Sequence, residues 1–407
     1  MANNERSTNA RPGICLQSPE VQADPYPTYA VMRNDYPVCQ VEPVGIWAVS
    51  RFKDVRFVLV NPEIFSASVS SALYDFDSPT DVGKDPRLII SQDPPEHGKY
   101  QRLVSKAFLD KATKPLIPLM RDTAKSLLTN FNKDTPVDFV EYFAYPYIGT
   151  IIRRIVGLDD EQSLAELRQW VELEESVALP RPDDTFIKAF EAAISRQNRY
   201  FTKIMNERRK NPQDDLVTHL VMAEVDGRKL TDEEICGLLC LLVSAGFVTT
   251  IHMLNHAIIL LSQKPDLLAE LCALPQLLPA FIEELFRYSP SVLATVRMTT
   301  RAVTIAGVEI PAGETVMPLL ASANRDPSEF QNPDVFDLTR PRNKRHLAFG
   351  HGVHTCLGAA LARLELRIAL ETLLGTYSYI ACPPDDDLVW IDTLFVRGVS
   401  ELPVSFR

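Results

Sequence analysis

The uncharged stretch from Gly237 to Leu261, GLLCLLVSAGFVTTIHMLNHAIILL, restricts the fold more than any other segment. Its 25 residues carry no charge and are long enough to cross a bilayer as one helix. The stretch also contains six polar residues that are costly in lipid: Ser244, Thr249, Thr250, His252, Asn255 and His256. Its flanks are long and typical of a soluble protein. We therefore expect a helix buried on all sides in the centre of a large domain.

The composition agrees with a soluble globular protein. Hydrophobic residues fill 46% of the 407 positions and charged residues 23%, which are ordinary proportions. A formal net charge of -11 disfavours general binding to nucleic acid or to anionic membranes. Seven scattered cysteines indicate a reducing, cytoplasmic environment. The polar N-terminus has no signal-peptide core, so we expect a disordered tail (1–12) and a single domain (13–407).

Periodicity predicts a mainly α-helical protein with a small β region. The residues TDEE at 231–234 form a capping box that starts the central helix. Further helices are predicted at 164–173, 187–208, 279–288 and 357–374. Strands are predicted at 46–49 and as a pair within 303–320, joined by a hairpin turn at Pro311, Ala312 and Gly313.

The segment FGHGVHTCLG, residues 349–358, gathers three glycines, two histidines and a cysteine. Cys356 lies directly before a predicted helix, whose free N–H groups and dipole favour a thiolate over a thiol. Gly350, Gly352 and Gly358 permit positive φ and a close approach of the backbone to a flat ligand. The pattern therefore favours a large planar ligand over a small ion.

Two other chemistries fit the same segment less well. A zinc site would draw on four residues within eleven positions, namely His346, His351, His354 and Cys356. Their spacing does not match the paired ligand spacing of structural zinc sites. A Cys–His nucleophile pair lacks any family-specific signature here.

The pattern F-G-x-G-x-H-x-C-x-G resembles the haem-binding loop of the cytochrome P-450 family, in which a cysteine thiolate is the axial ligand of the iron. Other segments resemble family motifs in the expected order: DPPEH (93–97), LLVSAGFVTT (241–250), EELFRY (283–288), ANRDP (323–327) and FDLTR (336–340). Each segment alone has an ordinary explanation as a turn, a core helix or a solvated ion pair. Their joint order, between Asp24 and Phe406, carries the resemblance.

The resemblance implies a single-domain fold with haem b between the long central helix and the cysteine loop. It assigns Cys356 as the iron ligand and Phe349 as its shield, with Gly350 and Gly358 in the same loop. Haem propionates would be bound by His97, Arg297 and His354, where charge-assisted hydrogen bonds are strong. A structural network would join Glu284, Arg287 and Arg340.

On the oxygen side, the resemblance implies that Ala245 and Gly246 make room for dioxygen and that Thr249 helps to deliver a proton. The alternative for Thr249 is a hydrogen bond to its own i−4 carbonyl. Many relatives carry an acid immediately before this threonine, whereas Val248 cannot accept or relay a proton. Gln101 also departs from the family pattern, since bacterial relatives often have at this position an arginine that binds a haem propionate.

The implied function is that of a haem-thiolate monooxygenase, which inserts oxygen from O2 into a mainly apolar small molecule. Electrons would come from NAD(P)H through a ferredoxin and its reductase, and the protein would be a cytoplasmic monomer that binds no nucleic acid and no membrane. Between 340 and 367 there are six basic residues, of which Arg340 is expected to be internal; the other five would form a basic face that attracts the acidic carrier, or else a solvated helix face: Arg342, Lys344, Arg345, Arg363 and Arg367.

Two alternative functions remain at this point. Because Val248 replaces the acid, the same fold would suit an atypical oxidation, such as oxidative coupling, desaturation or peroxide-driven turnover. A haem-binding sensor or carrier is the non-enzymatic alternative. The resemblance places eight residues in the substrate pocket: Leu73, Tyr74, Phe76, Val248, Val292, Leu293, Val296 and Leu394. Phe395 adds to the apolar character of this set, which is typical of a site for a mainly apolar molecule.

Overall fold

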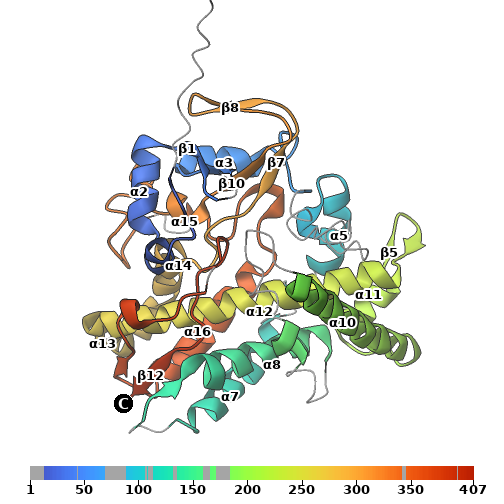
Figure 1. The fold of residues 1–407 in the computed structure, drawn as a ribbon. Coiled ribbons are helices and arrows are strands. Elements are labelled where there is room, and N and C mark those ends of the chain that lie inside the picture. Colours follow the sequence, from blue (N-terminus) through green and yellow to red (C-terminus); the bar gives the residue numbers. More distant parts are fainter. Residues whose placement is uncertain are drawn as a thin grey trace, which may run out of the picture.

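Helices form most of the molecule; the larger group of strands lies at one end of it, and shorter strands lie elsewhere (Figure 1). The structure is a computed structural model that describes residues 13–407 except 44, 69–88, 106–107, 109–112, 132–134, 159–165, 171–183, 342–344 and 392. The expected tail, 1–12, lies outside the described residues. The prediction of a mainly α-helical protein with a small β region is confirmed.

The helices are α1 (Pro19–Ala23), α2 (Tyr26–Asp35), α3 (Phe52–Val60), α5 (Glu96–Ser105), α7 (Ile117–Leu128), α8 (Tyr145–Val156), α10 (Asp184–Lys210), α11 (Leu216–Met222), α12 (Asp232–Gln263), α13 (Pro265–Ala273), α14 (Leu278–Tyr288), α15 (Leu320–Ala323) and α16 (Ala359–Leu374). The helices predicted at 187–208, 279–288 and 357–374 correspond to α10, α14 and α16. Of the helix predicted at 164–173, residues 166–170 are helical and the rest lies outside the described residues.

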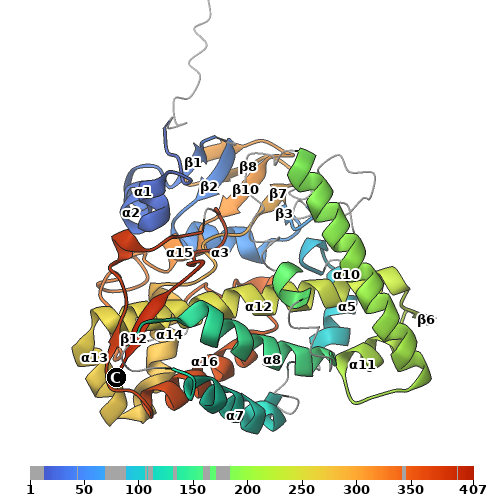
Figure 2. The same ribbon diagram turned by 60° about the horizontal axis from the view of Figure 1, so that its bottom comes forward.

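The central helix α12 runs through the middle of the molecule and packs on both α8 and α16 (Figures 1 and 2). Its predicted capping box is confirmed: Thr231 Oγ1 accepts from the Glu234 amide (3.2 Å), and the Glu234 carboxylate accepts from the Thr231 amide (2.8 Å). Among the described residues, α12 is the one helix long and apolar enough to cross a membrane, and 56% of its most apolar window is buried inside the protein. It therefore forms the core of the helical part.

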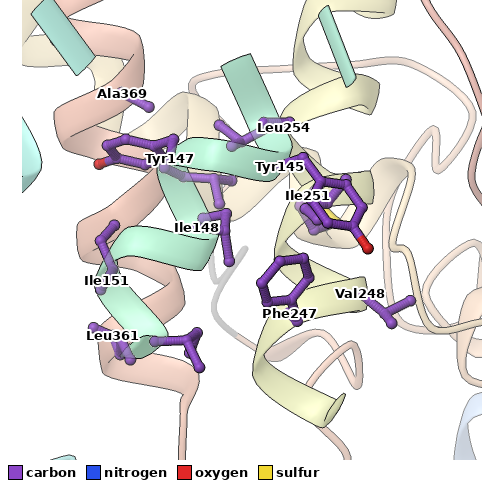
Figure 3. Packing of buried hydrophobic residues seen from close by; sticks show 14 of the residues in the cluster. Tyr145, Tyr147, Ile148, Ile151, Phe247, Val248, Ile251, Leu254, Leu361 and Ala369 are labelled. Carbon is purple, nitrogen blue, oxygen red and sulfur yellow. The ribbon is translucent and has the colours of Figure 1, made fainter. Parts of the chain in front are cut away.

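One face of α12 packs directly on α8 (Figure 3). Phe247, Ile251 and Leu254 lie on this face, at i, i+4 and i+7, and point toward Tyr145 and Ile148 of α8. The rings of Tyr145 and Phe247 meet edge to face, with centroids 4.8 Å apart. Each fully buried side chain of this size contributes roughly 1.5–3 kcal/mol, so the pairing fixes α12 firmly in the core.

A five-stranded mixed sheet has the strand order β1-β2-β10-β7-β3. Its strands are β1 (Val38–Val41), β2 (Ile46–Val49), β10 (Thr315–Pro318), β7 (Arg297–Thr299) and β3 (Phe65–Ser66). The remaining strands pair as β11 (Ile380–Ala381) with β12 (Pro403–Phe406) and β4 (Val137–Asp138), as β5 (Glu224–Val225) with β6 (Arg228–Lys229), and as β8 (Val303–Ile305) with β9 (Val308–Ile310). The strand predicted at 46–49 is confirmed as β2.

The predicted hairpin at Pro311 to Gly313 is wrong. The segment VTIAGVEI folds on itself instead, because β8 pairs with β9 around Ala306 and Gly307. Both turn residues have positive φ, 51° and 84°, as a two-residue turn of the hairpin type requires. The next strand, β10, pairs in parallel with β2 and antiparallel with β7.

Candidate functional site

The cysteine loop is held in a shape that two glycines make possible. Gly350 and Gly352 have φ of 67° and 78°, in the left-handed region that favours glycine. A Cβ on Gly352 would lie 2.6 Å from the Leu59 carbonyl oxygen of α3, so α3 also requires glycine there. The Cys356 amide donates to the Phe349 carbonyl (2.9 Å), which closes the loop before Gly358 caps α16.

The thiol of Cys356 is exposed, yet burial by the surrounding chain raises its pKa. Together these facts indicate that the sulfur faces an interior space. The N–H groups of Gly358 and Ala359 and the Arg363 guanidinium act in the opposite direction on the pKa, but burial is the larger influence. The N–H groups at the helix start thus favour the thiolate, as expected from the sequence, but they do not outweigh burial. A thiolate here needs a further positive charge close to the sulfur.

The histidines that suggested zinc do not converge on Cys356. Among the described residues, no group of three or more His, Cys, Asp or Glu side chains is arranged to hold a metal ion. His346 is buried, with its Nε2 3.4 Å from the Glu283 carboxylate. The zinc alternative is therefore contradicted.

A partly buried ion pair behind the cysteine loop was missed by the sequence analysis. Arg363 of α16 donates to both carboxylate oxygens of Glu283 on α14, and its guanidinium lies 4.4 Å from the centre of the Phe349 ring. Burial alone would raise the pKa of Glu283, but its bonds to His346 and Arg363 hold the pKa at about 2. Arg363 is 34% exposed and paired with Glu283, so it is less available on the expected basic face than an unpaired arginine would be. The one sequence feature that could have indicated this role for Arg363 is its position on the helix that follows Cys356.

The three residues expected at the haem propionates come together from distant parts of the chain. His97 is buried at the start of α5, and its ring centre lies 4.2 Å from that of His354 in the cysteine loop. Burial and Arg297 lower the pKa of His97, and the same two causes lower that of His354 to about 3. Burial lowers the pKa of Arg297, on β7, to about 10. Such a cluster of nitrogen donors is suited to binding an anion.

The donors of this cluster fit a haem carboxylate. His354 Nε2 is buried and has no hydrogen-bond partner among the described residues. In the described part of the chain, the Arg297 guanidinium donates to the Val296 carbonyl (2.6 Å) and to Thr295 Oγ1 (3.3 Å), with no carboxylate within ion-pair distance. A buried cation without a counter-ion is costly, so an anionic ligand group fits here. With the interior-facing thiol of Cys356, the donor set is that of a haem site.

Gln101 lies next to this cluster, and its Nε2 is 3.4 Å from the Val353 carbonyl of the cysteine loop. We expect Gln101→Arg to slow the loss of haem to an apo-globin trap, because the new guanidinium adds a charge beside the propionates. The expected factor is about 1.4 to 5, corresponding to the ~0.2–1 kcal/mol of a partly exposed ion pair. Gln101→Leu, which removes the amide without adding charge, is the control. Equal loss rates for Gln101→Arg and the parent would mean that the propionates are already satisfied.

On α12, Ala245 is exposed and Thr249 half-buried, although most of this helix is buried. The Thr249 hydroxyl donates to the Ala245 carbonyl (2.8 Å), so the alternative i−4 hydrogen bond is present. This bond leaves the lone pairs of the hydroxyl oxygen available as acceptors. Gly246 lies against α8, since a Cβ there would be 2.9 Å from Ile152 Cδ1. Helix packing is therefore sufficient reason for glycine at 246.

The residues expected in the substrate pocket fall into different environments. Leu73, Tyr74 and Phe76 lie outside the described residues. Leu293 and Leu394 are buried in the cluster around β1 and β2, which favours a packing role. Three others are buried or half-buried: Val248, Val292 and Val296.

Glu284, Arg287 and Arg340 form a buried and fully bonded network. Arg287 and Glu284 are both 0% exposed and make two hydrogen bonds (2.7 and 2.9 Å), and Arg340 Nε donates to the same carboxylate (2.9 Å). The two guanidinium groups also donate to the carbonyls of Asn324, Gln331, Asn332, Pro333 and Val335. The network ties α14 to the chain before the cysteine loop, as the sequence analysis expected.

Known proteins are similar to this chain along nearly its whole length. The sequence matches the family model for cytochrome P-450 over residues 34–401. Erythromycin C-12 hydroxylase from Saccharopolyspora erythraea is 35% identical over 378 residues, 92% of each chain. Vitamin D(3) 25-hydroxylase from Pseudonocardia autotrophica is 34% identical over 388 residues, 94% of each chain. A Bacillus megaterium cytochrome P-450, solved in complex with testosterone, has a TM-score of 0.84 at 33% identity and covers 95% of this chain and 99% of its own.

Proposed function

The chain belongs to the cytochrome P-450 family and is a monooxygenase, and on this premise we propose that it oxidises a large, mainly apolar molecule with electrons from a ferredoxin. The observation that carries the proposal is the cluster of His97, Arg297 and His354 beside the loop that presents Cys356, in which Arg297 is buried and, among the described residues, no carboxylate lies within ion-pair distance of it. Haem b, when bound, supplies the activation of dioxygen and the insertion of oxygen into a C–H or double bond.

Four residues hold the haem in this proposal. Cys356 binds the iron as a thiolate, which the N–H groups of Gly358 and Ala359 help to stabilise. The propionates accept hydrogen bonds from His97, Arg297 and His354, which relieves the burial of the Arg297 charge. Phe349 covers the sulfur side and is itself held between Phe286 and Arg363.

Thr249 is the polar group on the oxygen side of α12. Its hydroxyl proton is donated to the Ala245 carbonyl, so its oxygen would accept a hydrogen bond from a water molecule. Val248, immediately before it, brings no proton and is buried. This apolar neighbour favours a second candidate within the family, an atypical oxidation such as coupling, desaturation or peroxide-driven turnover.

The proposed substrate class follows from the relatives and from the apolar lining. The names of the relatives give erythromycin and vitamin D3 as substrates, and testosterone as a bound ligand. Val292 and Val296 follow α14 and are apolar, as are Leu73, Tyr74 and Phe76 in the sequence. A polycyclic or macrocyclic molecule with few polar groups suits such a site.

Optical titration tests the substrate proposal. We expect vitamin D3 or testosterone, added to the ferric protein, to displace water from the iron and to shift the Soret band toward the high-spin position. Benzoate, which is small and charged, is the control and should cause no shift. Turnover with ferredoxin, reductase and NADPH would then give an oxygenated product. A titration in which all three compounds behave alike would contradict the proposed substrate class.

The proposed electron donor is a ferredoxin with its NAD(P)H-dependent reductase, and the protein is proposed to be a cytoplasmic, single-domain monomer. The basic face behind the cysteine loop is smaller than expected. Arg340 is buried, Arg363 is 34% exposed and paired with Glu283, and Arg367 lies 3.8 Å from Glu371. Arg345 lies 3.5 Å from Glu329 but remains 55% exposed, the most of these residues, while 342–344 lie outside the described residues. Arg345 is thus the described residue of this set best placed to attract an acidic carrier.

A further inference from the structure

Polar side chains follow one face of α12, starting at Thr249. Ala245 lies at the start of this face, and the polar residues Thr249, His252 and His256 follow it at i+4, i+7 and i+11. At about 100° per residue, this spacing keeps them within about 60° of one another. By the same rotation, Phe247, Ile251 and Leu254, which pack on α8 (Figure 3), lie on the opposite side of the helix. The helix therefore presents an apolar face to α8 and a polar stripe away from it.

The far end of this stripe is buried and only partly hydrogen-bonded. His256 is 2% exposed, and Asn255, which flanks the stripe about 60° around the helix from His252, is 0% exposed. His256 Nδ1 donates to the Ser289 carbonyl (2.9 Å), which leaves Nε2 as an acceptor with no partner among the described residues. Both amide atoms of Asn255 also lack a partner among those residues. Each such buried atom costs about 1–3 kcal/mol unless bonded, so internal water fits this place.

The segment before β12 covers the stripe. The His252 imidazole lies flat against Gly398, where a Cβ would be 2.1 Å from Nδ1. Beside it, the buried Arg397 guanidinium lies 3.5 Å from the centre of the Trp390 ring. Burial and Arg397 lower the pKa of His256 to about 3, so His256 is neutral at physiological pH. Asp24 and Asp385 act on Arg397 from neighbouring segments, which places acidic groups near this end of the stripe.

We propose that His252, Asn255 and His256 position a file of water molecules that delivers protons to the Thr249 hydroxyl. The proposal rests on the monooxygenase function. Val248 cannot deliver a proton, and the Thr249 oxygen is free to accept a hydrogen bond because its own proton binds Ala245. Along the helix axis, Thr249 and His252 are about 4.5 Å apart and His252 and His256 about 6 Å, distances that one or two waters bridge.

The efficiency of proton supply can be measured without any organic substrate, from the products of oxygen reduction. Reduction of O2 to hydrogen peroxide takes two electrons and two protons, and reduction to two water molecules takes four of each. The electrons come from NADPH through ferredoxin and its reductase in both cases. A slower proton supply at Thr249 therefore releases more of the oxygen as peroxide. The share of NADPH electrons recovered as peroxide measures the positioning role directly.

The experiment uses the full-length, haem-loaded protein and its variants His252→Phe and His256→Phe, in which a ring of similar size replaces each imidazole. We expect the peroxide share to rise at least about twofold in both variants. The solvent deuterium isotope effect on NADPH oxidation should also increase, and the rate of water formation should fall about tenfold or more, since positioned proton donors contribute ~10²–10⁴-fold. Ile258→Leu, on the same helix outside the stripe, is the matched control and should leave all three values unchanged.

A crystal structure of the parent gives a readout independent of turnover. We expect the parent structure to show water within hydrogen-bond distance of His256 Nε2 and of the Asn255 amide. We expect the structure of His256→Phe to lack the water at position 256. A dry site in the parent, or an unchanged peroxide share and isotope effect in both variants, would overturn the proposal. If the phenylalanine variants fail to fold, Gly398→Ala displaces the His252 ring while keeping both histidines, and the same rise in peroxide is expected. A parent that oxidises no NADPH would instead contradict the monooxygenase function.

Discussion

Cys356→Ser is expected to abolish oxygen insertion and to remove the spectral signature of a haem thiolate. In the reduced protein with carbon monoxide, the Soret band of the parent should lie far to the red, and that of the variant should not. The reason is that a serine hydroxyl does not supply the electron density with which the thiolate favours O–O cleavage. The fold should survive, because the sulfur is exposed to an interior space and does not pack in the core. Far-UV circular dichroism checks this point.

Cys382→Ser is the matched control, because Cys382 is a half-buried cysteine near β11 and far along the chain from the loop. It should keep both the red-shifted band and turnover. The cationic cluster of His97, Arg297 and His354 is untouched in Cys356→Ser, so some haem should still bind in the variant. A red-shifted carbon monoxide band in Cys356→Ser would show that another residue is the ligand and would remove the basis of the site.

The cysteine loop was predictable because its chemistry lies within ten consecutive residues. The positive φ of Gly350 and Gly352 follows the pattern that the sequence indicated. The pair of Glu283 and Arg363 was not predictable in this way, since it joins residues 80 positions apart and the motif that contains Glu283, EELFRY (283–288), does not indicate Arg363 as its partner. Pairing at such a distance depends on how α14 and α16 pack, which local sequence does not specify.

Competing local signals explain the remaining differences from the sequence analysis. At 303–320, two turn signals lie close together, and the tighter one, at Ala306 and Gly307, makes the hairpin. For Cys356, the helix start and burial act on the pKa in opposite directions, and only the structure shows that burial is the larger influence. The central helix was predictable from end to end because its capping box and its apolar length indicate the same element.

The second large effect is expected at the buried network around Glu284. Glu284→Gln should lower the free energy of unfolding by about 3–5 kcal/mol, because it leaves two buried guanidinium groups without their counter-charge. Their hydrogen bonds to backbone carbonyls do not replace that charge. Since the network ties α14 to the chain before the cysteine loop, haem content should fall together with stability. Chemical denaturation, followed by circular dichroism and by Soret absorbance, measures both quantities.

The same substitution at a surface carboxylate separates this effect from a general cost of removing charge. Glu371 on α16 is 34% exposed and lies 3.5 Å from Arg121, so Glu371→Gln should cost no more than about 1 kcal/mol. Arg287→Lys should behave like Glu284→Gln, because a lysine cannot make the two parallel hydrogen bonds to Glu284 or reach the carbonyls of Asn324 and Pro333 together. Equal stability losses at Glu284 and Glu371 would mean that the network contributes no more than a surface ion pair. The haem-side architecture would then depend on the apolar contacts of α14 and α16 alone.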